Sequence, residues 1–204
     1  RANDIKIFDG KWLEKYLILD ILEYIINKKQ IIKAETEIAI TANEITDLLI
    51  EMIKILSKQY KKLTIVTNHI EKFRKLEQQL QEKGIIATIT NNKKKSLMKS
   101  QIIINIDFPK ELINKYRINE SATIVNVKSP IKITQKRFNG VTVNDYEIEY
   151  RNDICNEKFF TDKYNLKDLY EAEMYKRDSF TNLRKKIKND KVLINKLYLN
   201  NGEL

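Results

Sequence analysis

Cysteine, histidine, glycine and proline are all scarce in this chain of 204 residues, which contains one, one, four and two of them respectively. The single cysteine, Cys155, excludes an internal disulfide and suits a reducing compartment, so we expect a cytoplasmic protein. Because no motif surrounds it, we interpret Cys155 as a small apolar residue or an inert thiol. No apolar run reaches the roughly 18 residues that span a bilayer, and no signal peptide is visible. We therefore expect no membrane association.

The formal net charge of +10 raises the question of a nucleic-acid partner. Most lysines are dispersed among acidic residues, and only Lys93–Lys95 and Arg184–Lys188 form basic runs. Solvated loops and helix ends account for such runs more often than nucleic-acid sites do. The abundance of Ile, Lys and Asn is typical of an AT-rich genome, so the charge alone does not identify a partner. Nucleic-acid binding through these runs is kept as an alternative.

Apolar segments of strand length alternate with segments of helical periodicity from residue 37 to residue 127. A helix over Lys11–Lys29 precedes them, with Asp9 as a candidate N-cap. The expected strands are Glu37–Thr41, Leu63–Thr67, Ile86–Thr90, Gln101–Ile106 and Thr123–Val127, and the expected helices are 44–59, 70–83, 93–99 and 111–116. Such alternation predicts an α/β fold with a mostly parallel, doubly wound sheet and right-handed crossovers.

The pattern changes after Pro130. Ile131–Gln135 and Val141–Tyr150 alternate in polarity around a Phe-Asn-Gly turn and predict an antiparallel hairpin. A long helix over Asn165–Lys188 and a strand over Val192–Leu199 follow. We therefore expect a Rossmann-like domain with a leading helix at 1–130. The hairpin, long helix and terminal strand at 131–204 would pack on that domain or mediate association with another protein or a second copy.

Three segments carry a family resemblance over about residues 37–130. Ser100–Pro109 reads S-Q-I-I-I-N-I-D-F-P and resembles the A-D-I-I-I-N-A-T-P segment of shikimate dehydrogenases and the related segment of glutamyl-tRNA reductases. Val66–Lys72 is similar to their V-x-N-R-T-x-E-K, and Thr123–Pro130 is similar to their v-x-D-v-v-Y-x-P. The order and spacings agree apart from one residue missing near position 70. Together the segments favour this NAD(P)-binding Rossmann subclass.

The resemblance implies a position for the adenosine 2′-phosphate of NADP after the second strand. The Asn-Arg-Thr of those families corresponds here to Asn68, His69 and Ile70. Asn68 matches, His69 is mostly neutral at pH 7, and Ile70 lacks the Thr hydroxyl. Lys72 and Arg74 lie nearby and could compensate. The alternative interpretation is that Asn68 caps the second helix and His69 is exposed in its first turn.

The turn after the first strand lacks the glycines of a dinucleotide-binding loop. Thr41, Ala42, Asn43 and Glu44 occupy that turn, and their Cβ atoms would crowd a pyrophosphate. Asn43 is a candidate N-cap of the following helix, while Glu44 and Asp47 place carboxylates in its first turn. The chain is therefore expected to fill its own anion site, so we expect no cofactor, with NADP in a modified pose as the alternative.

Residues that would perform catalysis are not evident. In the related families they come from an N-terminal substrate domain, whereas only a helix precedes the first strand here. We see no metal-ligand cluster and no Ser or Cys triad spacing, and we assign no catalytic or metal-binding residue. Asn105 and Asp107 follow the fourth strand, where ligands bind in such sheets. The candidate cofactor-binding residues are Thr41, Ala42, Asn43, Thr67, Asn68, His69, Lys72 and Asn105.

We accordingly expect a diverged, non-catalytic, Rossmann-like binding or scaffolding protein. One alternative is an NADP-dependent oxidoreductase-like domain whose catalytic domain preceded Arg1, which stands where an initiator Met would be expected. The other alternative is a nucleic-acid-binding protein.

Overall fold

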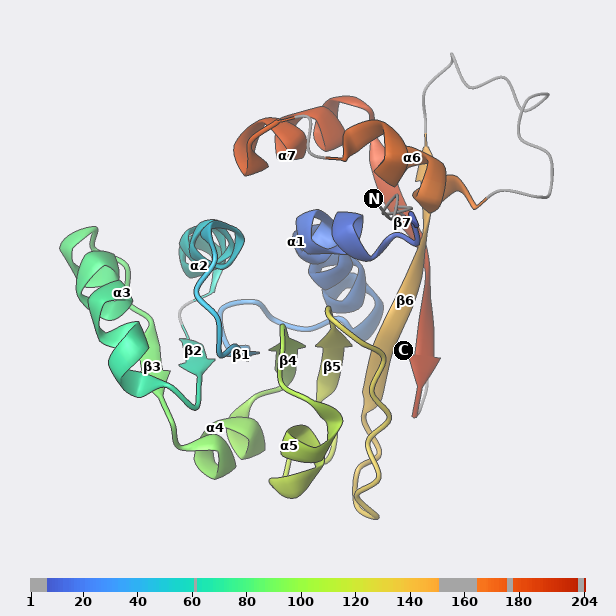
Figure 1. Cartoon of the computed structure of the whole chain (residues 1–204). Helices are drawn as coiled ribbons and strands as arrows, with labels where there is room; N and C mark the ends of the chain where they lie inside the picture. The colour runs from blue at the N-terminus through green and yellow to red at the C-terminus, as the bar shows by residue number, and fades with distance from the viewer. Residues whose placement is uncertain (1–6, 61, 151–164, 176–177, 202–203) are drawn as a thin grey trace, which may run out of the picture. The chain divides into compact units, whose positions relative to one another are not determined.

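The computed structural model describes residues 7–60, 62–150, 165–175, 178–201 and 204, as a series of helices and strands (Figure 1). The helices are α1 (Lys11–Lys29), α2 (Asp47–Gln59), α3 (Ile70–Glu82), α4 (Lys93–Lys99), α5 (Lys110–Lys115), α6 (Leu166–Met174) and α7 (Phe180–Asn189). The strands are β1 (Glu37–Thr41), β2 (Lys62–Val66), β3 (Thr88–Thr90), β4 (Ile102–Asn105), β5 (Thr123–Asn126), β6 (Val141–Tyr150) and β7 (Val192–Asn200).

The strands form one seven-stranded sheet in the order β3-β2-β1-β4-β5-β6-β7. All pairs from β3 to β6 are parallel. The hydroxyl of Thr142, near the start of β6, donates to the carbonyl of Asn200 at the end of β7, so these two strands run antiparallel. The expected α/β fold with a mostly parallel sheet is confirmed.

The chain divides into two compact units, and we call residues 1–22 and 146–197 the first unit and residues 23–145 and 198–204 the second unit. In the second unit, α2 and α3 cover one face of the sheet and α4 and α5 cover the other (Figure 1). This arrangement follows from right-handed crossovers whose direction reverses between β1 and β4. β4 is buried along its whole length, as its unbroken Ile-Ile-Ile run predicts for a strand covered on both faces.

Aromatic side chains and an ion pair organise the first unit. The Trp12 and Tyr175 rings lie 5.2 Å apart edge to face, and the Tyr16 and Phe180 rings stack at 5.2 Å. Arg184 forms an ion pair with Asp20. These contacts pack α7 against the N-terminal half of α1, because they bury aromatic surface and place the rings in favourable orientations. The Arg184 guanidinium, which belongs to a predicted nucleic-acid-binding run, is therefore engaged within the protein.

Two predicted N-caps are wrong. The helix after β1 begins at Asp47, and its N-cap is Thr46, whose hydroxyl accepts a hydrogen bond from the Leu49 N–H at 3.2 Å. Asn43 therefore lies in the preceding loop. The residue at the N-cap of α3 is His69 rather than Asn68, and its side chain makes no capping bond. Asn68 and His69 are both exposed.

Three predicted elements also differ from the structure. β3 is shorter than expected, because residues 85–87 are not in a strand. Ile131–Gln135 forms no strand, so β6 pairs with β5 on one side and β7 on the other instead of with that segment. The expected helix over 165–188 is two helices, because Ser179 starts α7 by accepting a hydrogen bond from the Asn182 N–H at 3.4 Å.

Some predictions fall on residues outside the described part of the chain. Cys155 and the whole of the segment expected to be irregular, 151–163, are among them. Among the described helices, even the longest, α1, falls short of the combination of length and hydropathy that a membrane span requires.

Candidate functional site

The eight predicted site residues lie together at the carboxyl ends of β1, β2 and β4 in the second unit. Thr41 ends β1 and is the register partner of Asn105, which ends β4. Ala42 and Asn43 continue from β1, and the remaining four come directly after β2 or from the first turn of α3. Because carboxyl ends of parallel strands share one edge of the sheet, three separate sequence segments meet here.

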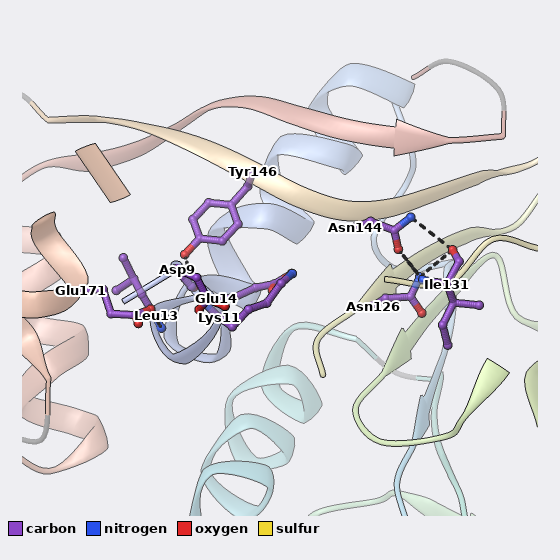
Figure 2. A network of polar contacts seen from close by, with 10 residues as sticks. Asp9, Lys11, Leu13, Glu14, Asn126, Ile131, Asn144, Tyr146 and Glu171 are labelled. Carbon is purple, nitrogen blue, oxygen red and sulfur yellow. Dashed lines mark hydrogen bonds and ion pairs between the residues drawn. The ribbon is translucent and has the colours of Figure 1, made fainter. Parts of the chain in front are cut away.

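A row of buried polar side chains crosses four strands at this edge, and we call Thr41, Asn105, Asn126 and Asn144 the polar row. The Thr41 hydroxyl donates to Asn105 Oδ1 at 2.7 Å, and Asn105 Nδ2 donates to Asn126 Oδ1 at 3.1 Å. Asn126 Nδ2 donates in turn to Asn144 Oδ1 at 2.9 Å (Figure 2). All four residues are at most 6% exposed. Each amide bonds to its neighbour, so the row ties β1, β4, β5 and β6 together.

The polar row also fixes the chain that leaves the strands. Asn105 accepts from the Phe108 N–H and donates to the Phe108 carbonyl, both at 3.1 Å. Asn144 accepts from the Ile131 N–H at 2.9 Å and donates to the Ile131 carbonyl at 3.2 Å (Figure 2). These amides therefore replace backbone partners for two turns that belong to no strand.

The first three backbone N–H groups of the loop between β1 and α2 are bonded within the protein. The Ala42 N–H donates to the Val66 carbonyl at 3.0 Å. The Asn43 N–H donates to both Asp107 carboxylate oxygens, at 2.8 and 3.0 Å, and the Glu44 N–H donates to Asp107 Oδ2 at 3.0 Å. Charge-assisted bonds of this kind are among the stronger ones in proteins. In a dinucleotide-binding loop, N–H groups at this position face the pyrophosphate.

The side chains of the loop are engaged as well. Asn43 Oδ1 accepts a hydrogen bond from the Asn68 N–H at 3.0 Å, which joins the loops after β1 and β2. Lys72 Nζ lies 2.6 Å from Glu44 Oε2, and this hydrogen bond and the lysine charge lower the Glu44 pKa. Lys72, predicted to compensate for the missing Arg at a 2′-phosphate position, is therefore paired with Glu44 of the loop between β1 and α2. Both side chains are exposed, so this ion pair adds little stability.

A buried lysine lies beside this edge of the sheet. Lys93, the first residue of α4, is 8% exposed. Its ammonium group is 3.4 Å from the Thr67 carbonyl and 3.3 Å from the Asn91 carbonyl. It also lies 5.8 Å from the centre of the Tyr116 ring. Burial lowers the pKa of Lys93.

Sequence reasoning missed the role of Asp107 and the extent of the polar row. The sequence places Asp107 where ligands bind in such sheets, whereas its carboxylate accepts hydrogen bonds from the loop after β1. Its position two residues beyond Asn105 was a usable signal, because parallel pairing of β1 with β4 brings both loops to one edge. No signal in the sequence separates Asn126, at the end of β5, or Asn144, within β6, from other asparagines of the chain.

A second polar cluster lies in the first unit. The Glu171 carboxylate accepts a hydrogen bond from the Leu13 N–H at 2.9 Å, in the first turn of α1. The Tyr146 hydroxyl donates to the Gly10 carbonyl at 2.7 Å (Figure 2). Glu171 is 1% exposed, and burial raises its pKa, opposed by hydrogen bonds from the N-terminal backbone of α1. Glu171 therefore caps α1 from α6.

The described residues contain no group of three or more His, Cys, Asp or Glu side chains that could hold a metal ion. In comparisons with known proteins, no family model and no curated protein matches the chain.

Proposed function

We propose that the chain is a diverged, non-catalytic binding or scaffolding protein, built on a Rossmann-like sheet whose anion site is occupied by its own side chain. The observation that carries the proposal is the Asp107 carboxylate, which lies within 3.0 Å of the Asn43 and Glu44 N–H groups. A phosphate at this loop would have to displace a carboxylate that already makes three hydrogen bonds. It would also meet the like charge of that carboxylate.

The polar row supports a structural role for the strand ends. A catalytic acid, base or polar anchor needs a free donor or acceptor within reach of a substrate. Asn105 uses its amide on Thr41, Phe108 and Asn126, and it is 3% exposed. Asn105, one of the candidate cofactor-binding residues, thereby uses its amide within the protein.

A calorimetric titration with NADP tests the proposal. Asp107→Ala frees the two N–H groups and removes one negative charge, so we expect the affinity for NADP to rise at least about tenfold over the wild type. Asp47→Ala is the matched control, because it removes an exposed carboxylate in the first turn of α2 that does not bond to the loop. If Asp107→Ala gains no more than Asp47→Ala, the carboxylate is not what closes the anion site.

For a protein partner or a second copy, the C-terminal elements offer a surface. β7 stands at the end of the strand order, and Leu193 on it is 44% exposed. Terminal strands of this kind pair readily with another chain. Sedimentation velocity should show self-association of the wild type, and Leu193→Asp should weaken it. If the wild type stays monomeric at all concentrations, a second copy is excluded as the partner of β7 and a different protein remains.

A further inference from the structure

A cleft of about 410 Å³ lies on the α4-covered face of the sheet in the second unit. It is lined by residues of β2, β3 and α4, by residues adjoining them, and by Glu37 of β1. None of the eight predicted site residues lines it, and neither does Asp107. Its volume falls within the range of small-molecule sites, roughly 300–1,000 Å³.

Three threonines contribute hydroxyl groups to the strand side of the cleft. Thr64 on β2 is the register partner of Thr88 on β3, and Thr90 lies two residues further along the same face. The lining is not wholly polar, because Leu63 of β2 and Ile86, two residues before β3, also contribute to it. On the face of β2 that carries Thr64, Val66 is buried in one cluster with Leu97 of α4, whereas Thr64 lines the cleft, because α4 has only seven residues and leaves part of this face uncovered.

The helix side of the cleft is cationic. Lys95 and Lys99 are four residues apart on α4 and therefore project from one side of the helix. A third lysine in the lining, Lys62, is paired with Glu37 at 3.2 Å. Within the described part of the chain, neither Lys95 nor Lys99 forms an ion pair. Two like charges at this spacing destabilise a helix unless an anion lies between them.

The threonine hydroxyls add donors to these two charges. Among the residues that the structure describes, the Thr64 and Thr88 hydroxyls have no hydrogen-bond partner, so both can donate to a ligand. A phosphate group has several acceptor oxygens and at least one negative charge, which matches ammonium groups on one side and hydroxyl donors on the other.

We propose that this cleft binds a small organic phosphate, with Lys95 and Lys99 neutralising the phosphate and Thr64 and Thr88 hydrogen-bonding to it. The proposal goes beyond the proposed function, because it assigns a ligand class to residues that lie outside the closed dinucleotide site. The phosphates of a nucleic-acid strand share the same chemistry, and the test below separates the two sources.

Pyrophosphate titrated into the ¹⁵N-labelled full chain, followed by amide chemical shifts, is the direct test. We expect the amides of Thr88 and Ser96 to shift with saturation below about 10 mM. The double variant Lys95→Gln, Lys99→Gln should lose about tenfold or more in affinity. Lys94→Gln, Lys110→Gln is the matched control, since it removes two exposed lysines outside the cleft lining. It should lose much less.

Three results would overturn the proposal. The Thr88 and Ser96 amides could stay unshifted, or the control could lose as much affinity as the cleft variant, which would mean general charge attraction. A short polythymidine strand could also bind far more tightly than pyrophosphate and shift amides well beyond the cleft, which would assign the lysines to nucleic acid. Because Asp107 lies outside the cleft, Asp107→Ala should leave the cleft shifts unchanged, so this test and the NADP test fail independently.

Discussion

Replacing Asn105 with Leu removes the first of the three amides of the polar row while keeping a side chain of similar size. The substitution leaves the Phe108 N–H and Asn126 Oδ1 without the partners that Asn105 supplies, and it also removes the acceptor of the Thr41 hydroxyl. Each buried polar group left unpaired costs about 1–3 kcal/mol. The Thr41 hydroxyl can rotate toward another acceptor, and the added apolar surface offsets part of the loss. We therefore expect a net destabilisation of about 3 kcal/mol.

Urea unfolding followed by far-UV circular dichroism measures this loss. Circular dichroism is used instead of tryptophan fluorescence, because the single tryptophan, Trp12, belongs to the first unit, whereas Asn105 belongs to the second. Asn105→Asp gives a second comparison, since it keeps the shape and the acceptors but removes the Nδ2 donor, and we expect a loss of similar size. Asn91→Leu is the control, because Asn91 is exposed. A loss below about 1 kcal/mol for Asn105→Leu, or an equal loss in the control, would refute the claim that the hydrogen bonds of Asn105 stabilise the folded protein.

Two further predictions concern a buried acid and a close backbone contact. Burial raises the folded-state pKa of Glu171 above its unfolded value near 4.3, so the native state binds the proton more tightly. The stability that Glu171 contributes at low pH should therefore fall as the pH rises through the raised pKa. Thermal unfolding followed by Trp12 fluorescence should show this fall in the wild type and a smaller fall in Glu171→Gln. Equal falls in the two proteins would contradict the prediction. At Gly140 an added Cβ would lie 2.1 Å from the Ala122 carbonyl oxygen, so Gly140→Ala should cost about 1–3 kcal/mol in urea unfolding. It should cost more than Gly84→Ala, where the backbone φ of +69° is strained but no atom lies within 4 Å; a smaller cost at Gly140 would argue against this close approach.

The parallel sheet could be predicted because its strands carry their signal locally. Ile102–Asn105 has the unbroken apolar run of a strand that is covered on both faces. The helices between the strands have the helical apolar periodicity of elements that are buried on one face. The same pattern locates the turn after the first strand, and the absence of glycine from that turn can be read directly from the sequence.

Residues 131–135 show why the rest could not be predicted. Ile131 and Ile133 alternate with polar residues and are 1% and 2% exposed, so their burial matches a strand. Their segment is nonetheless irregular, because side chains, in place of a neighbouring strand, form hydrogen bonds with its backbone N–H groups. The Ile131 N–H donates to Asn144, and the Thr134 N–H donates to Asn114 Oδ1 at 2.8 Å. Side-chain amides from other parts of the chain make the hydrogen bonds that a partner strand would otherwise make. Such bonds leave the periodicity of the sequence unchanged, so the periodicity cannot predict them.

The helix break near residue 178 had a usable signal. Asp178 and Ser179 precede Phe180, and such residues favour an N-cap over a helix interior. The helical spacing on both sides concealed it, because two helices in succession can continue one apolar stripe. Asp107 differs, because its partners lie 63 and 64 positions away and depend on the strand order.

The central claim is that Asp107 occupies the anion site of this sheet, and the amide resonances of Asn43 and Glu44 test it most directly. Pyrophosphate added to the ¹⁵N-labelled protein should leave both resonances unshifted in the wild type at about 10 mM, while in Asp107→Ala both should shift progressively. Wild-type resonances that move at this concentration, to the same extent as in the variant, would show that the loop is open to phosphate and would contradict the account.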